Sequence, residues 1–156
     1  MKTKPLLLEC RIPLPRQLRF YLYSVTQHAS ERQVDTFKIQ LTSGNPVNGE
    51  SGKRFTFDRT GGIRPILIGY HADLRVFILW DAELHDAQGG FAFSSSCQAP
   101  PDLIYSAVTH GLAIAERPLK RLARTEEMLA SRPERLIEAI EKRIALSNKS
   151  LLDGVV

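Results

Sequence analysis

The sequence is poor in cysteine and contains no long apolar run. Cys10 and Cys97 are the two cysteines among 156 residues. They are too few for a disulfide scaffold and too far apart in the chain for a zinc-finger pattern. No apolar run approaches the roughly 20 residues of a membrane-spanning helix. The three leucines after Pro5 fall short of the apolar stretch of about 7–15 residues in a secretory signal. We therefore expect a cytoplasmic protein with reduced thiols and no membrane partner.

Several catalytic patterns are also missing. Serines 94–96 stand in no Gly-x-Ser-x-Gly elbow. The glycine-rich segment 44–54 contains Gly-Lys but lacks the spacing and the Ser/Thr of a phosphate-binding loop. His71, His85 and His110 are scattered, which is not a metal-ligand spacing. We expect no catalytic residue, no metal and no cofactor in this chain, so any nuclease activity would belong to a separate domain or subunit.

What is present fits an ordinary globular chain. Hydrophobic residues make up 43% of the sequence and charged residues 24%, and 156 residues are enough to bury a core without disulfide or metal support. No repeat or internal boundary is evident. We assign residues 1–147 to one domain and residues 148–156 to a C-terminal tail.

The charge is unevenly distributed along the chain. The net charge is +4, but residues 1–64 hold eleven Lys/Arg against five Asp/Glu, whereas residues 65–156 hold ten against twelve. A concentration of positive charge suggests a polyanionic partner such as DNA. The alternative is a basic surface that binds no polyanion.

Strand patterns come first and helix patterns later. The segments 6–12, 19–26, 36–42 and 91–98 are rich in apolar, aromatic or β-branched residues. Residues 64–81 contain two apolar runs around a short turn, which predicts a central hairpin covered on both faces. Helices are expected over 100–112 and from Ser131, as N-cap with Pro133 just inside the helix, to about 147. This order predicts an α+β fold, with a curved, mostly antiparallel sheet or open pseudo-barrel and two or three C-terminal helices on one side.

Basic side chains near the predicted strand ends are candidate phosphate contacts. A second basic cluster covers residues 117–124, and a helical conformation would bring its members onto shared faces. A solvated helix face is the alternative for this cluster. The candidate phosphate contacts are Arg16, Arg19, Lys53, Arg54, Arg59, Arg64, Arg117, Lys120, Arg121 and Arg124.

Short polar side chains and one aromatic residue are candidates for base contacts. Ser94, Ser95, Ser96 and Gln98 could hydrogen-bond to base edges. Trp80 and Asp81, with His85 nearby, could hold an extruded base by stacking and hydrogen bonding. Strand alternation places Trp80 and Asp81 on opposite faces. A core tryptophan followed by a capping or ion-paired aspartate is therefore the alternative.

A small metal-dependent nuclease is an alternative function. Its candidate groups are Asp73, Asp81, Glu83 and His85. A PD-(D/E)XK site needs a lysine two residues after the second acid, and His85 stands there after Glu83. The histidines also lack the asparagine of an HNH metal finger.

Four segments together resemble small modules of bacterial restriction–modification systems. They are 66–71, 76–85, 94–98 and the helix end at 110–113, and the resemblance extends from about Arg19 to Arg143. Such modules often stand N-terminal to, or beside, nuclease domains of the HNH type. The resemblance implies a DNA-recognition domain that binds double-stranded DNA, including methylated DNA, together with a separate nuclease domain or subunit. A protein-interaction subunit of a defence system, contacting its partner through the C-terminal amphipathic helix, remains a third alternative.

Overall fold

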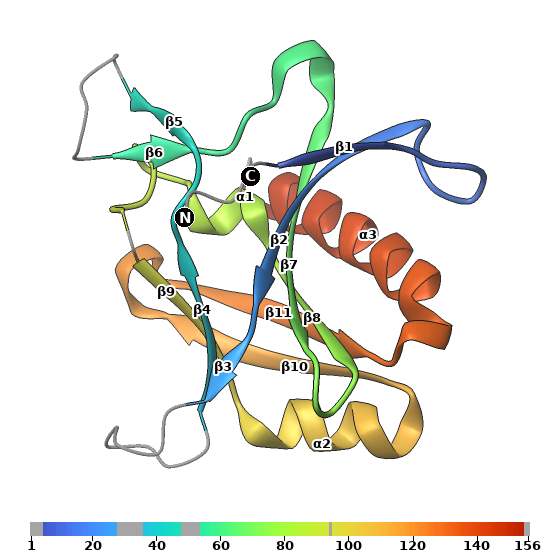
Figure 1. The fold of residues 1–156 in the computed structure, drawn as a ribbon. Coiled ribbons are helices and arrows are strands. Elements are labelled where there is room, and N and C mark those ends of the chain that lie inside the picture. Colours follow the sequence, from blue (N-terminus) through green and yellow to red (C-terminus); the bar gives the residue numbers. More distant parts are fainter. Residues whose placement is uncertain (1–4, 28–35, 48–53, 94, 155–156) are drawn as a thin grey trace.

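The computed structural model describes residues 5–27, 36–47, 54–93 and 95–154. Its largest element is an open sheet of six strands in the order β1-β2-β7-β8-β11-β10 (Figure 1). β2 and β7 are parallel, and the other neighbours are antiparallel. This confirms the expected α+β class with a mostly antiparallel, open sheet. The strands are β1 (Leu6–Glu9), β2 (Gln17–Ser24), β7 (Arg64–His71), β8 (Val76–Trp80), β10 (Leu112–Leu119) and β11 (Arg124–Ser131).

A smaller sheet and three α-helices complete the fold. The small sheet has the order β3-β4-β9, and β5 and β6 form a separate two-stranded ribbon. These elements are β3 (Thr26–Gln27), β4 (Phe37–Leu41), β5 (Asn45–Pro46), β6 (Phe55–Thr56) and β9 (Ser95–Ala99). The α-helices are α1 (Ala82–His85), α2 (Pro101–His110) and α3 (Leu136–Gly154), and the 3-10 turns are η2 (Thr60–Gly62), η3 (Lys120–Leu122) and η4 (Pro133–Arg135).

The central strands of the main sheet are buried on both faces. Ile66, Ile68 and Leu79 face α3, where they pack with Ala139 and Ile140. Their neighbours in the strands face the other way, because successive side chains of a strand alternate between its faces. These neighbours pack against the small sheet and α2, and they include Leu67, Ile78, Trp80, Met128 and Ala130. The central hairpin expected at 64–81 is therefore confirmed, with both faces covered.

The two long helices lie on opposite faces of the main sheet, although the sequence led us to expect the helices on one side. Leu103, Ile104 and Ala107 of α2 belong to the core that contains the small sheet. α3 packs against the other core. No helix in the described ranges is long and apolar enough to cross a lipid bilayer.

Both helix starts follow the signals in the sequence. α2 begins at Pro101 with Asp102 in its first turn, and it ends before Gly111, whose φ of 88° is left-handed. α3 follows η4, which contains Pro133, but the expected N-cap Ser131 is instead the last residue of β11, and Arg132 precedes η4. α3 continues through 148–154, where we expected a tail. Arg124 explains part of this extension, since its guanidinium donates to the carbonyl and hydroxyl oxygens of Ser150, both at 2.7 Å.

The basic segment 117–124 forms no α-helix, so the expectation of shared helix faces is wrong. It contains the end of β10, the turn η3 and the first residue of β11. In this antiparallel pair Arg117 lies opposite Glu126, and Leu119 lies opposite Arg124. β11 also pairs with β8, so strand formation here extends the main sheet.

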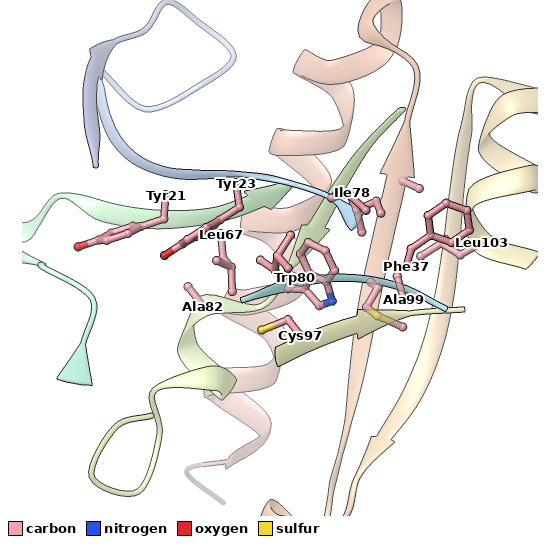
Figure 2. Packing of buried hydrophobic residues seen from close by; sticks show 14 of the residues in the cluster. Tyr21, Tyr23, Phe37, Leu67, Ile78, Trp80, Ala82, Cys97, Ala99 and Leu103 are labelled. Atoms are coloured by element: carbon pink, nitrogen blue, oxygen red, sulfur yellow. The ribbon is translucent and has the colours of Figure 1, made fainter. Parts of the chain in front are cut away.

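The two sheets approach closely at Gly69 of β7. A Cβ at this position would lie 2.6 Å from Val25 Cγ2 and 2.9 Å from Ile39 Cγ2. The ring of Trp80 would lie 3.2 Å away. Figure 2 shows Trp80 at the centre of the cluster between the sheets, with Cys97 of β9 beside it. Gly69 is therefore required for the contact between the sheets.

We predict that Gly69→Ala lowers the free energy of unfolding by about 1–3 kcal/mol, because the added methyl overpacks the core. Urea unfolding measures this change. Ser24→Thr also adds a methyl group, at an exposed position on the neighbouring strand β2, and it should leave the stability within about 0.5 kcal/mol of wild type. Equal effects of the two substitutions would contradict the proposed close approach.

Candidate nucleic-acid interface

A pocket of about 820 Å³ lies where an edge of the small sheet meets an edge of the main sheet. β9 is the edge strand of the small sheet, and β10 is the edge strand of the main sheet. In Figure 1, β9 lies beside the turn that joins β10 to β11. The pocket brings together seven residues that the sequence suggested for DNA binding, namely Arg54, His85, Ser95, Ser96, Gln98, Arg117 and Lys120.

Two side chains of the main sheet hold β9 in place. The backbone carbonyl of Gln98 accepts a hydrogen bond from the indole Nε1 of Trp80 at 2.9 Å. The same oxygen accepts a second hydrogen bond from Nη1 of Arg117 at 3.1 Å. An edge-strand carbonyl that lacks a neighbouring strand is thus satisfied by side chains. The Arg117 guanidinium therefore connects the two sheets at the wall of the pocket.

His85 joins this pocket to a buried polar network. Its Nε2 lies 2.7 Å from Oε2 of Glu126, and its Nδ1 lies 3.4 Å from Sγ of Cys97. Burial disfavours the imidazolium, but the neighbouring Cys97 and Glu126 outweigh burial and raise the pKa of His85 well above its ordinary value. The Glu126 side chain is fully buried, and its Oε1 has no hydrogen-bond partner within the described part of the chain.

Asp81 belongs to the same buried network, at the end of β8. Its backbone N–H donates to Oε2 of Glu126 at 3.0 Å. Its Oδ1 accepts from the Ser147 hydroxyl and from the backbone N–H of Glu83, both at 3.0 Å. Its Oδ2 lies 3.5 Å from Nη2 of Arg143, and the Asp81 and Arg143 side chains are 2% and 3% exposed. Burial lowers the pKa of Arg143, while the Asp81 carboxylate counteracts this effect.

These positions correct the interpretation of Trp80 and Asp81 as an open base-binding pair. Trp80 is fully buried in the core between the two sheets. Asp81 caps α1 and pairs with Arg143. The alternative of a core tryptophan followed by a capping, ion-paired aspartate is the arrangement that forms, because β8 ends at Trp80 and the chain turns into α1 at the next residue.

Several of the candidate phosphate contacts instead bind other parts of the chain. Arg19 pairs with Asp58 at 3.5 Å and donates to its carbonyl oxygen at 2.7 Å. Arg59 pairs with Glu83 at 3.0 Å and with Asp86 at 2.6 Å. Burial disfavours the Arg59 cation, but these two carboxylates raise its pKa above the ordinary value. Both arginines therefore stabilise the connection between β6 and β7 instead of lining the pocket.

The remaining candidates are dispersed. Arg64 and Arg124 bind Asn148 and Ser150 of α3, and Arg16 is exposed in the turn before β2. None of these three lines the pocket described above. Lys53, Ser94 and the side chain of Arg121 lie outside the described residues.

The candidate nuclease acids do not converge. Asp73 lies in the turn before β8, and Asp81 follows the last residue of the same strand. Glu83 pairs with Arg59. Within the described ranges, no group of three His, Cys, Asp or Glu side chains is placed to hold a metal ion. The apolar face of α3 is also used internally, since Ala139 and Ile140 pack on the main sheet.

Other residues of the site were not identified from the sequence. Cys97 and Glu126 position His85, although they lie 12 and 41 residues away from it in the chain. Phe91, Pro100 and Pro118 supply apolar parts of the pocket wall. No local pattern connects these residues, because the pairing of strands distant in sequence brings them together.

We predict that Asp81→Ala lowers the free energy of unfolding by about 3–5 kcal/mol. The reason is that the Arg143 cation would stay buried without the carboxylate that offsets its charge. Urea unfolding tests this value. Asp73→Ala removes another acid in an exposed turn and should change the stability by less than about 0.5 kcal/mol. A cost below 1 kcal/mol for Asp81→Ala would contradict the role of this ion pair.

We predict a pH-dependent contribution of His85 to stability. A histidine whose pKa is raised by folding stabilises the native state fully below its unfolded pKa of about 6.5. This contribution disappears as the pH rises through the folded pKa. The loss of stability in His85→Gln should therefore be larger at pH 6 than at pH 9. Urea unfolding at several pH values measures it, and His110→Gln, at an exposed position of α2, is the control. A pH-independent difference for His85→Gln would contradict the stabilised imidazolium.

Comparison with known proteins identifies the family. No curated protein and no solved structure matches the chain. A family model described as Methylase-associated X1 matches residues 16–140. The matched region runs from before β2 into α3, and it contains the pocket between β9 and β10 together with His85, Asp81 and Glu126 of the network behind it. The chain therefore belongs to the Methylase-associated X1 family.

Proposed function

We propose that this protein is a DNA-binding recognition module that works beside a methylase in a cytoplasmic restriction–modification system. The pocket between β9 and β10 carries this proposal, because it gathers basic and short polar side chains at one place. The family name, Methylase-associated X1, supports the restriction–modification context. DNA cleavage would be carried out by a nuclease domain or subunit outside the described fold.

The charges around the pocket favour an anionic ligand. Arg54 and Lys120 are exposed and line the pocket, and Arg117 lines it with its guanidinium bonded to β9. His85 also lines the pocket, with its two ring nitrogens directed at Glu126 and Cys97. Glu116 is the acidic residue of the lining. Positively charged side chains of this kind bind phosphates independently of base sequence.

Ser95, Ser96 and Gln98 provide a different kind of contact. They line the pocket on the strand whose position Trp80 and Arg117 fix. Hydroxyl and amide groups on a rigid strand can distinguish the hydrogen-bonding groups of bases. We therefore propose that the arginines and the lysine bind the phosphates, and that these β9 side chains recognise the base or its modification.

We predict salt-sensitive binding to double-stranded DNA. Lys120→Ala should weaken binding to all sequences and lower the slope of log affinity against log salt by about 1, because one phosphate contact is lost. Arg54→Ala should act in the same way. Fluorescence anisotropy with plain and methylated duplexes at several salt concentrations measures both quantities, and the methylated arm tests recognition of a modification.

The control for this experiment is Lys142→Ala. Lys142 is exposed on α3, which covers the opposite face of the main sheet from the small sheet. The variant removes the same charge but leaves the pocket intact. Equal weakening by Lys120→Ala and Lys142→Ala would show non-specific charge effects. Affinity that does not change with salt would contradict phosphate binding.

A further inference from the structure

The pocket between β9 and β10 is suited to one nucleotide. Its volume of about 820 Å³ lies within the range of about 300–1,000 Å³ that is typical of small-molecule sites. A double helix is too wide to enter a pocket of this size, since its major groove, which is only one part of its cross-section, is already about 12 Å wide. A duplex bound over the pocket would leave the interior empty unless one nucleotide entered it.

The β9 wall has hydrogen-bonding groups that are not used within the fold. Because strand side chains alternate, Cys97 points into the core while Ser96 and Gln98 line the pocket. The Gln98 side-chain amide and the Ser96 hydroxyl have no hydrogen-bond partner among the described residues. An amide carries both an acceptor and donors, so Gln98 can pair with the edge of a base.

The backbone that carries the Gln98 amide is also held in a fixed position. Its backbone carbonyl is anchored by Trp80 at 2.9 Å and by Arg117 at 3.1 Å. Trp80 itself is fully buried. Little conformational freedom of the strand is therefore left to be lost when a ligand binds, which favours selective recognition.

The other walls are apolar, and cations surround them. Pro100, Pro118 and Leu119 line the pocket, are at least partly exposed, and offer apolar surfaces on which a planar base can pack. Leu41, Leu84 and Phe91 also line it but are almost fully buried. Arg54 and Lys120 also line the pocket and are exposed to solvent. This combination of apolar walls, a polar edge and positive charges matches the parts of a nucleotide, which are the base faces, the base edge and the phosphate.

We propose that the pocket between β9 and β10 binds a single nucleotide extruded from DNA, with Gln98 and Ser96 recognising the base edge. This inference rests on the proposed DNA-binding function. Arg54 and Lys120 bind the flanking phosphates, and the apolar walls replace the stacking that the base loses on leaving the duplex. A free nucleotide has the same chemistry, so the experiment must distinguish a base within DNA from a free nucleotide.

The test compares a duplex that contains one central mismatch with a fully paired duplex of the same flanking sequence. Extrusion costs least for a mismatched base, so the wild-type protein should bind the mismatched duplex about fivefold or more tightly. Gln98→Leu should remove this preference while retaining the salt-dependent binding. Gln40→Leu is the matched control, because Gln40 lies opposite Ser96 on β4, is exposed and does not line the pocket.

A second measurement uses the four deoxynucleoside 5′-monophosphates and the backbone amide signals of the protein. If the pocket binds nucleotides, the signals of 95–99 and 116–120 should shift in the wild type and much less in Gln98→Leu. As a control for folding, the spectrum of Gln98→Leu outside the pocket should match that of the wild type. This measurement does not depend on any affinity for duplex DNA.

The outcomes separate the two proposals. Salt-dependent DNA binding without a mismatch preference, and without nucleotide-induced shifts at 95–99 and 116–120, overturns the nucleotide pocket and leaves the DNA-binding module standing. Shifts with free nucleotides but no binding to any DNA overturn the proposed function and assign the pocket to free nucleotides. A mismatch preference that persists in Gln98→Leu overturns the role of Gln98 in recognising the base.

Discussion

The hydrogen bond from Trp80 to Gln98 and the packing around it determine how the two sheets are placed. Trp80 fills the space between the main sheet and β9, and its indole N–H satisfies a carbonyl of an edge strand. Gly69 allows this packing because it has no side chain at the contact. The position of β9 relative to β10 follows from these contacts, and so does the pocket between them. A substitution that moves Trp80 would therefore change the pocket without touching its lining.

A second constraint lies at the end of β8, where polar groups cross the main sheet. Asp81 contacts Arg143 and Ser147 of α3 on one side and Glu126 through its backbone on the other. Glu126 in turn holds His85 at the pocket wall. Asp81, Glu126 and Arg143 at the centre of this network are almost fully buried. Each therefore needs the others to offset its loss of hydration. The network therefore links the docking of α3 to the geometry of the pocket.

Local signals in the sequence predicted the local structure well. Alternating and continuous apolar runs located the central hairpin, and the prolines before 102 and 134 located the helix starts. The segment 117–124 was misinterpreted, because its basic residues fit an exposed helix as well as a strand. Its strand residues pair within the β10–β11 hairpin, and residues 129–131 of β11 join this hairpin to the distant strand β8. The meeting of Gln98 with Arg117 depends on the same long-range pairing, so composition and spacing could suggest both residues but could not place them together.

The structure also changes the meaning of the positive charge in the first 64 residues. Arg19 and Arg59 are paired with acids of the same protein, and Arg64 binds α3. These three cations hold loops and a helix, so they are not free to bind an external anion. Arg54 and Lys120 remain exposed at the pocket. A DNA contact with so few cations gains little affinity from counterion release. Under the proposed function, discrimination between DNA sites would then come mainly from the short polar groups of β9, a strand whose backbone is anchored by Trp80 and Arg117.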